Sequence, residues 1–178
     1  MTVDLNYLTR RTLAYMLDCM IVFSVIMLLL QWLILTPVRG YFGIDELWFH
    51  DSSNMYMYVL FTISLPIWLY FSWFDSYKSS GTIGKRLMKL RVLNQTQLTV
   101  IGLPKSFLRT LLKLLPWELA HIGVIFPVHM FYAENPDLRI LLIIGLVLFI
   151  IYFFSIVTSK DSSSLYDKLL GVNVISLK

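Results

Sequence analysis

Charged residues and cysteines are both scarce in this 178-residue chain. Only 15% of the residues are charged and 57% are hydrophobic, whereas soluble domains average about 25% charged and about 45–50% apolar residues. The single cysteine, Cys19, excludes a framework of disulfides within the chain. The apolar residues lie in long runs, which is typical of a membrane protein. The length indicates a single domain over residues 1–178.

The sequence also lacks the motifs of common enzyme chemistries. It has neither a His-Glu-x-x-His zinc motif nor a nucleophile elbow. Residues 79–87 look like a phosphate-binding loop, but only two residues separate Gly81 from Gly84, and Arg86 follows the lysine where serine or threonine is required. We therefore expect no enzyme activity, no catalytic residue, no cofactor and no metal site.

Four apolar stretches predict an all-α membrane protein built as a four-span helical bundle. Each is close to the roughly 20 residues that cross about 30 Å of hydrocarbon. The third stretch is the weakest, since it contains Glu118, His121 and two prolines. The spans are expected at about 13–36, 55–74, 114–132 and 139–158.

The basic residues gather on one side of such a bundle. With four crossings both termini share a side, and only Arg39 and Arg139 fall on the other side, where acidic residues dominate. An excess of lysine and arginine marks the cytoplasmic side. We therefore place the N-terminus, an insert at about 75–113 and the tail at 159–178 in the cytoplasm.

The cytoplasmic segments predict a small β-structure and a basic helix. Residues 90–93 and 98–102 are predicted to form a hairpin around a turn at 94–97, and the tail at 172–176 could supply a third strand. Residues 104–115 predict an interfacial helix with one basic face, although its lysines could instead merely flank the third span. We expect contacts with lipid headgroups from Lys85, Arg86, Lys89, Lys105, Arg109 and Lys113.

Asp18 is the most costly residue of the first span. It lies seven residues past Arg11, about 10 Å deeper along the helix, where an ionised carboxylate is costly unless it is paired or hydrated. It must therefore face inward and find a partner on another segment. Two interpretations remain open: a hydrogen-bonded aspartate that locks helices together, or a carboxylate that binds a proton or a cation.

Glu118 and His121 form a second polar pair within an apolar stretch. Their i, i+3 spacing places them on one face of a helix, which points either into the bundle or to the interface near Trp117. The pair resembles half of a di-iron site, but such a site requires further carboxylates, and Asp18 is the only other one in a span. We therefore treat the pair as a candidate for tuning Asp18, not for binding a metal.

Three segments form an ordered set: residues 11–18 (RTLAYMLD), 81–87 (GTIGKRL) and 165–171 (LYDKLLG). Their order and spacing resemble the RDD family of bacterial membrane proteins. The resemblance implies an integral protein of the bacterial cytoplasmic membrane with a largely unknown role, for which transport, including sodium–proton exchange, has been suggested. The arginine and the two aspartates that name the family fall on Arg11, Asp18 and Asp167.

Two features depart from the family pattern. Val172 stands where threonine is common, and the pair of Glu118 and His121 is not a family signature. Asp167 and Arg11 fall on the same side of the predicted bundle. We therefore predict a salt bridge or hydrogen bond that attaches the tail to the bundle, from Asp167 to Arg11, Lys85, Arg86 or Arg109.

Two functions fit these patterns. The first is a small transporter or channel for protons or small cations, with Asp18 as the titrating carboxylate; we find no internal repeat of the kind that many transporters have. The second is an accessory or structural membrane protein that binds a partner complex or anionic lipid. The expected partners are the lipid bilayer and either further copies of the chain or a membrane-protein complex, and no nucleic acid is expected.

Overall fold

In the computed structural model, the chain forms two compact units. Unit 1 consists of Met1–Val22, Trp68–Lys113 and Phe149–Lys178, and unit 2 consists of Phe23–Ile67 and Leu114–Leu148. The structure describes residues 5–76, 79, 81–134, 138–159 and 163–177.

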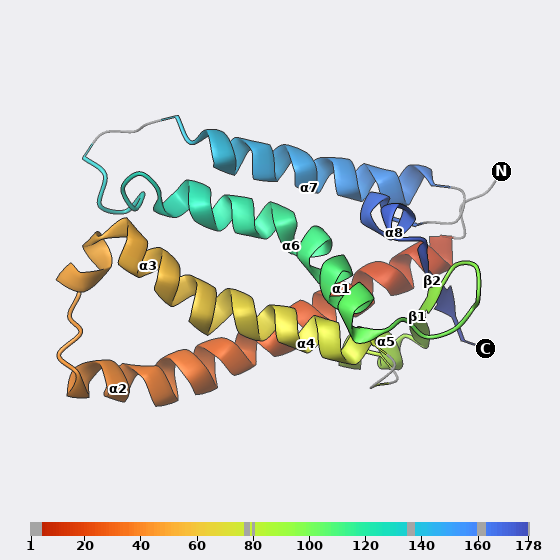
Figure 1. The fold of residues 1–178 in the computed structure, drawn as a ribbon, viewed down its shortest axis with the longest axis horizontal. Helices are drawn as coiled ribbons and strands as arrows, with labels where there is room; N and C mark the ends of the chain where they lie inside the picture. The colour runs from red at the N-terminus through yellow and green to blue at the C-terminus, as the bar shows by residue number, and fades with distance from the viewer. Residues whose placement is uncertain (1–4, 77–78, 80, 135–137, 160–162, 178) are drawn as a thin grey trace. The chain divides into compact units, whose positions relative to one another are not determined.

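Three helical stretches in the described residues are long and apolar enough to cross a membrane (Figure 1). They are Tyr7–Tyr41, Ser52–Asp75 and Ile140–Thr158. They contain or closely match the predicted spans at 13–36, 55–74 and 139–158, so these three predictions are confirmed as helices of sufficient length. The protein is mostly helical, as expected.

The first two stretches each contain a segment of wider, π-type helix. The first stretch is built from α1 (Leu5–Ser24), the π-type segment η1 (Val25–Leu35) and α2 (Thr36–Tyr41). A short 3₁₀ turn, η2 (Leu47–His50), follows. The second stretch is built from α3 (Ser52–Val59), the π-type segment η3 (Leu60–Ser64) and α4 (Leu65–Asp75). The third is α7 (Ile140–Thr158).

The region of the fourth predicted span differs from expectation. The interfacial helix at 104–115 and the span at 114–132 are parts of one helix, α6 (Leu103–Ile125), which continues through Pro116. The helix ends seven residues before the predicted end of the span, because Pro127 cannot extend it. Arg139 satisfies the carbonyl groups freed there, donating to the oxygens of Gly123, Val124, Phe126 and Val128.

The sheet has two antiparallel strands, β1 (Leu90–Asn94) and β2 (Val172–Ser176). The predicted tail strand is therefore confirmed, but the predicted hairpin is wrong: within 98–102 only Val100 forms an isolated bridge, to Leu93. Leu98 has a φ of 53°, which does not fit a regular ladder. The buried face of β1 and β2 packs with Ala14 and Ile101 into the hydrophobic core of unit 1.

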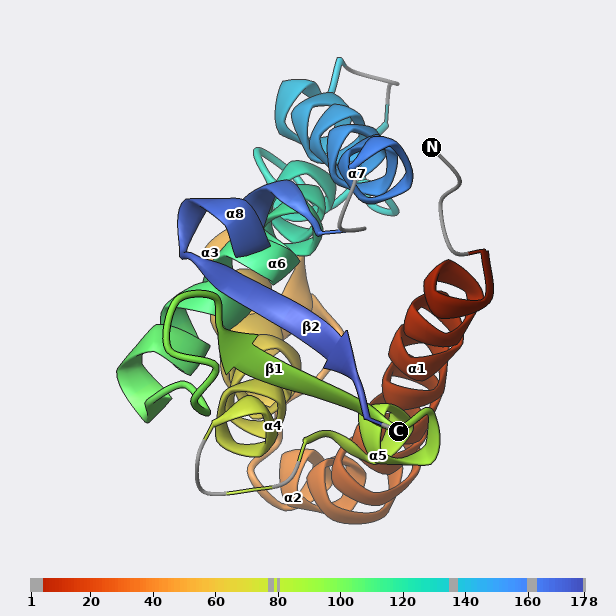
Figure 2. The same cartoon turned by 90° about the vertical axis from the view of Figure 1, so that its right-hand side faces the viewer.

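Each strand follows a one-turn helix, and the two helix–strand segments correspond element by element. α5 (Ile83–Leu87) precedes β1, and α8 (Leu165–Leu169) precedes β2. Figure 2 shows the two helices at opposite ends of the strand pair. The register is symmetrical about the pair Val92 and Val174. We call α5, β1, α8 and β2 together the cap.

The local geometry of the two segments is also the same. Thr82 and Ser164 are the N-caps, and each side chain accepts a hydrogen bond from the amide three residues later. Lys89 and Gly171 end the turns with φ values of 53° and 59°. The chain therefore contains an internal structural repeat that our sequence analysis missed, because it resides in caps and backbone angles that different residues satisfy.

Close helix packing and hydrogen bonds hold unit 2 together. A Cβ on Gly123 would lie 2.4 Å from a backbone nitrogen of α7, and a Cβ on Gly145 would lie 2.8 Å from a backbone oxygen of α6. Gln31 Nε2 donates to Thr62 Oγ1 at 2.8 Å and so joins η1 to η3. Small residues and interhelical hydrogen bonds are typical contacts between helices in membranes.

Candidate functional site

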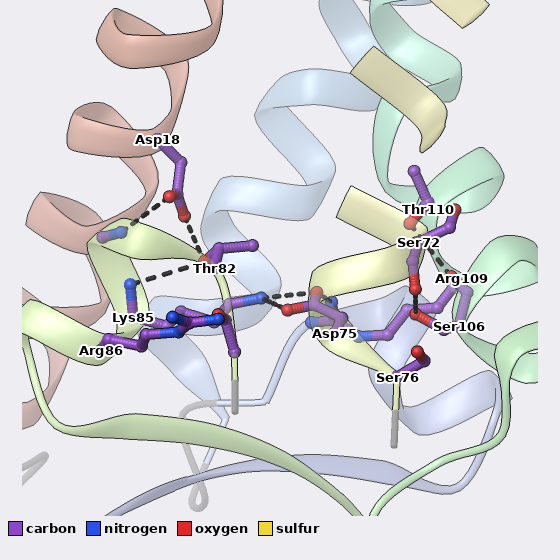
Figure 3. A network of polar contacts seen from close by, with 12 residues as sticks. Asp18, Ser72, Asp75, Ser76, Thr82, Lys85, Arg86, Ser106, Arg109 and Thr110 are labelled. Atoms are coloured by element: carbon purple, nitrogen blue, oxygen red, sulfur yellow. Dashed lines mark hydrogen bonds and ion pairs between the residues drawn. The ribbon is translucent and has the colours of Figure 1, made fainter. Parts of the chain in front are cut away.

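Asp18 is completely buried within α1 and is bound by the start of α5. Its carboxylate accepts hydrogen bonds from Thr82 Oγ1 at 2.6 Å, from the Gly84 amide at 2.8 Å and from the Tyr70 hydroxyl at 3.0 Å. Figure 3 shows Asp18 directed at Thr82. The expectation that Asp18 faces inward, toward partners on other segments, is confirmed.

Gly84 allows this approach of α5 to α1. A Cβ at residue 84 would lie 2.1 Å from the carbonyl oxygen of Ala14 and 3.0 Å from Asp18 Cγ. No side chain fits this space, since real Cβ contacts are never so short with a backbone atom. Gly84, the second glycine of residues 79–87, is thus required for the packing of α5 against α1 and not for binding a phosphate.

A chain of alternating charges joins five elements of unit 1. Asp75, the last residue of α4, accepts hydrogen bonds from Lys85 of α5 and, at 2.8 Å, from Arg109 of α6. Arg109 also donates from Nε to Asp167 of α8 at 2.8 Å. Arg11 of α1 binds the other oxygen of Asp167. The predicted contact of Asp167 is therefore confirmed for two of its four candidate partners.

Burial makes this network energetically sensitive. Asp75 is 2% exposed, Asp167 is 0% exposed and Arg109 is 2% exposed. Removing one partner from a buried ion pair costs about 3–5 kcal/mol, because the other charge remains without compensation. Burial alone would raise the pKa of the Asp167 carboxyl, but Arg109 and Arg11 outweigh it and hold that pKa below its usual range.

Lys113 lies one turn along α6 from Arg109 and is half-buried. Its Nζ lies 3.7 Å from the ring centre of Phe71 and 4.3 Å from that of Tyr15. Such cation–π contacts stabilise an ammonium group by about 0.5–2 kcal/mol. Among the described residues, aromatic rings rather than a carboxylate are thus the partners of the Lys113 ammonium group.

A hydroxyl group joins α6 to α4 beside the charged network, and a second one lies next to it within α6. Ser106 Oγ donates to the carbonyl oxygen of Ser72 at 2.8 Å, and Thr110 Oγ1 donates to that of Ser106 at 3.0 Å. All three residues are buried (Figure 3). These small polar side chains allow the two helices to pack closely.

The six residues expected at lipid headgroups lie in different environments. Lys85 and Arg109 are buried and paired with Asp75, which differs from headgroup contact, because the aspartates inside unit 1 require cations. Lys113 points at aromatic rings. Of the remaining three, Lys105 is half-buried, while the exposed pair is Arg86 and Lys89.

Glu118 and His121 belong to unit 2, whereas Asp18 belongs to unit 1. His121 Nδ1 lies 3.8 Å from Glu118 Oε2, and both side chains are partly exposed. The geometry within each unit therefore gives no support to the tuning of Asp18 by this pair. Among the described residues no group of three or more histidine, cysteine, aspartate or glutamate side chains is arranged to hold a metal ion.

Two important participants, Asp75 and Tyr70, were not predicted from the sequence. Asp75 ends an apolar span and is followed by a basic segment, and this position could have marked it as a buried counter-ion. Tyr70 lies within an apolar span, and nothing in its sequence surroundings indicates its hydrogen bond to Asp18.

Comparison with known families settles the membership of the chain. The model of the RDD family matches residues 6–171. The chain belongs to the RDD family. Comparison with curated proteins and with solved structures found no match. In this RDD protein, Arg11 and Asp167, which the resemblance predicts to be the arginine and the second aspartate of the family pattern, contact each other directly. Asp18, the predicted first aspartate, binds α5.

Proposed function

We propose that this RDD protein is an accessory membrane protein whose buried charges hold the cap to the ends of α1, α4 and α6. The observation that carries the proposal is that Asp18, Asp75 and Asp167 each bind at least two donors from other elements of unit 1. The cap then presents a fixed surface to anionic lipid or to a partner complex. The proposed role is not enzymatic.

The pairing of β1 with β2 supports four membrane crossings. Hydrogen-bonded strands lie on the same side of a bilayer, so the chain between them crosses it an even number of times. α7 is a candidate span, and we infer that α6 is the other crossing between the strands. With 23 residues, α6 is about 35 Å long in total; the part after Arg109 is about 24 Å long, most of the roughly 30 Å hydrocarbon core.

The internal repeat supports the same topology. Arg11 in α1 and Arg109 in α6 both bind Asp167, and each is followed by threonine and leucine. α6 thus corresponds to α1, which begins the first candidate span. Three charges of α6 would be costly in lipid. Arg109 and Lys113 have partners within unit 1, and Glu118 lies 3.8 Å from His121 of the same helix.

The distribution of charge supports a cytoplasmic cap. In the four-span topology, most lysines and arginines lie on the side of the cap, and this asymmetry is typical of the cytoplasmic face. Both termini then lie in the cytoplasm, and the bacterial cytoplasmic membrane is the proposed location.

The geometry of the carboxylates favours this role over transport. A cation-binding site needs oxygen ligands that are free to turn toward the ion. The oxygens of Asp18 receive three hydrogen bonds from protein donors, and those of Asp167 receive two guanidinium groups. Binding a cation would require these contacts to break.

Transport of protons or small cations is the second candidate function. The observation that favours it is the complete burial of Asp18 inside the first candidate span, where an ionisable residue often marks an ion pathway. In this alternative, protonation of the carboxylate would release it from Thr82 and the Gly84 amide.

Ion flux distinguishes the two functions. The protein is reconstituted into liposomes with an imposed sodium or proton gradient, and wild type is compared with Asp18→Asn and with empty liposomes. We expect wild type to match empty liposomes, and to copurify with a partner complex from native membranes. Flux by wild type that Asp18→Asn abolishes would replace the accessory role with transport; flux that survives the substitution would refute both assignments of Asp18.

A further inference from the structure

We propose that an anionic phospholipid binds beside the cap, with its phosphate between Arg10 and Lys89. This inference rests on the proposed accessory role and deepens it, because it names the lipid class and the side chains that recognise it. The site lies within unit 1, apart from the buried charges around Asp75.

A hollow of about 580 Å³ provides the space. Its lining residues come from α1, from the turn between α5 and β1, and from the end of β2, and they include two cations and no acid. A phosphate diester in this hollow would be close to two positive charges. The lining residues are Arg10, Leu87, Met88, Lys89, Ser176 and Leu177.

Arg10 is fixed in place and still has donors to offer. Its guanidinium donates to Ser176 Oγ at 2.9 Å and to the carbonyl oxygen of Met88. A guanidinium carries five N–H donors in a planar fork that matches phosphate oxygens. The two contacts with the cap therefore orient Arg10 and leave donors for a ligand.

Lys89 is exposed and also lines the hollow. It occupies the turn between α5 and β1 with a φ of 53°, a conformation that glycine adopts most readily and that Gly171 adopts at the matching place in the repeat. A lysine here accepts a backbone conformation that glycine would adopt more easily. Its ammonium group, which glycine lacks, supplies the second charge of the site.

The apolar side chains around the hollow distinguish a lipid from a free anion. Leu87 is 65% exposed and Leu177 is 42% exposed. On α1, Leu13 and Met20 are exposed as well, and Leu13 lies one turn after Arg10 in the direction of the membrane. A lipid whose phosphate is held at Arg10 could thus lay its acyl chains along this exposed face of α1.

Short-chain lipids test the site on the full-length protein. Dioctanoyl phosphatidylglycerol, dioctanoyl phosphatidylcholine and inorganic phosphate are titrated against the protein in a neutral detergent, and binding is measured from the shift in unfolding temperature. We expect binding of phosphatidylglycerol that neither phosphatidylcholine nor inorganic phosphate reproduces. Equal binding of phosphatidylcholine would remove the charge argument, and equal binding of inorganic phosphate would reduce the site to an anion site without a lipid.

Matched variants locate the binding. Arg10→Gln combined with Lys89→Gln should weaken binding of phosphatidylglycerol about 30-fold, because each cation near the headgroup contributes about fivefold. Lys105→Gln combined with Lys168→Gln removes the same charge elsewhere and should leave binding within about twofold of wild type.

Lys89→Gln alone keeps the test decisive if the double variant does not fold, since Lys89 is exposed; we expect about fivefold weaker binding. Unchanged affinity in the Arg10 and Lys89 variants would overturn the proposal. An ion flux by wild type would refute the accessory role without altering these lipid affinities, so the two failures are distinguishable.

Discussion

Three buried aspartates each organise a different contact of the cap. Asp18 binds the beginning of α5 without a cation, through the Thr82 hydroxyl and the Gly84 amide, and it also accepts a hydrogen bond from Tyr70 of α4. Asp75 and Asp167 are each bound by two cations, and Arg109 is common to both. Because a buried charge is costly unless it is compensated, loss of any one partner should weaken the whole set.

Gly84→Ala tests the approach of α5 to α1. The added Cβ would lie 2.1 Å from the Ala14 carbonyl oxygen, so the helix must move and the bonds of Asp18 lengthen. We expect the free energy of unfolding in detergent to fall by about 1–3 kcal/mol. Gly102→Ala is the control, since its Cβ would meet only Pro104 at 3.8 Å. Equal effects of the two substitutions would refute the docking role of Gly84.

The pH dependence of stability tests the charge on Asp167. Its pKa is lowered in the folded protein relative to the ordinary value of 3.8, so the unfolded chain binds the proton more tightly. The stability from this group is therefore present above pH 3.8 and is lost as the pH falls toward the folded-state pKa. Thermal unfolding should show wild type more stable than Asp167→Asn at neutral pH, with the difference shrinking in acid. A difference that is constant with pH would contradict the assigned charge.

At the residue scale, sequence reasoning succeeded where energetic cost pointed to a single answer. Asp18 had to turn inward because lipid offers a carboxylate no partner, and Asp167 had to seek a cation on its own side of the bilayer. Which cations pair with each buried aspartate cannot be derived in this way. The pairing of Arg109 with both Asp75 and Asp167 depends on how α4, α6 and α8 pack, and local sequence does not contain that information.

The elements of the cap are too short to be stable alone. α5 and α8 have five residues each, and a two-stranded sheet is marginal in isolation. Their N-caps and the buried charges must therefore supply the order. The hairpin prediction failed for the same reason: β1 pairs with β2 because that partner brings Val172 and Val174 into the core of unit 1, and a tertiary contact outweighs the nearer segment.

Substitutions of Thr82 test the capping of α5. Its hydroxyl accepts from the Lys85 amide and donates to Asp18, so Thr82→Val removes a cap and leaves a carboxylate oxygen with one donor fewer. We expect a loss of about 2 kcal/mol or more in unfolding free energy. Thr82→Ser keeps the hydroxyl and should retain most of the stability. If the serine variant is as unstable as the valine variant, the hydroxyl is not the cause.

At the scale of the whole molecule, three of the four predicted spans agree with helices of sufficient length. The fourth prediction, at 114–132, falls partly on α6, which is not among the three candidate spans. Its composition gives a weaker signal because its first half carries charges that belong to the network of unit 1. The internal repeat also escaped the sequence analysis, since threonine and serine, or lysine and glycine, occupy its matching positions.

Cysteine labelling tests the proposed four crossings. In a Cys19→Ser background, Thr96→Cys and Lys168→Cys place a thiol on exposed sites in unit 1, and Glu46→Cys places one on an exposed site in unit 2. A membrane-impermeant maleimide added to intact cells should label only the Glu46→Cys variant. Labelling of Lys168→Cys but not of Thr96→Cys from outside would place the tail on the other side and contradict a crossing by α6. Labelling of both, without Glu46→Cys, would contradict the cytoplasmic cap.

Hydrogen–deuterium exchange on Asp167→Asn tests most directly whether buried charge holds the cap. The variant removes the carboxylate that Arg11 and Arg109 share, while Glu46→Gln removes a charge at an exposed site as the control. We expect the amides of β1 and β2 to exchange faster together in Asp167→Asn, with α7 protected as in wild type and with no change in Glu46→Gln. Unchanged protection of both strands in Asp167→Asn would contradict the account.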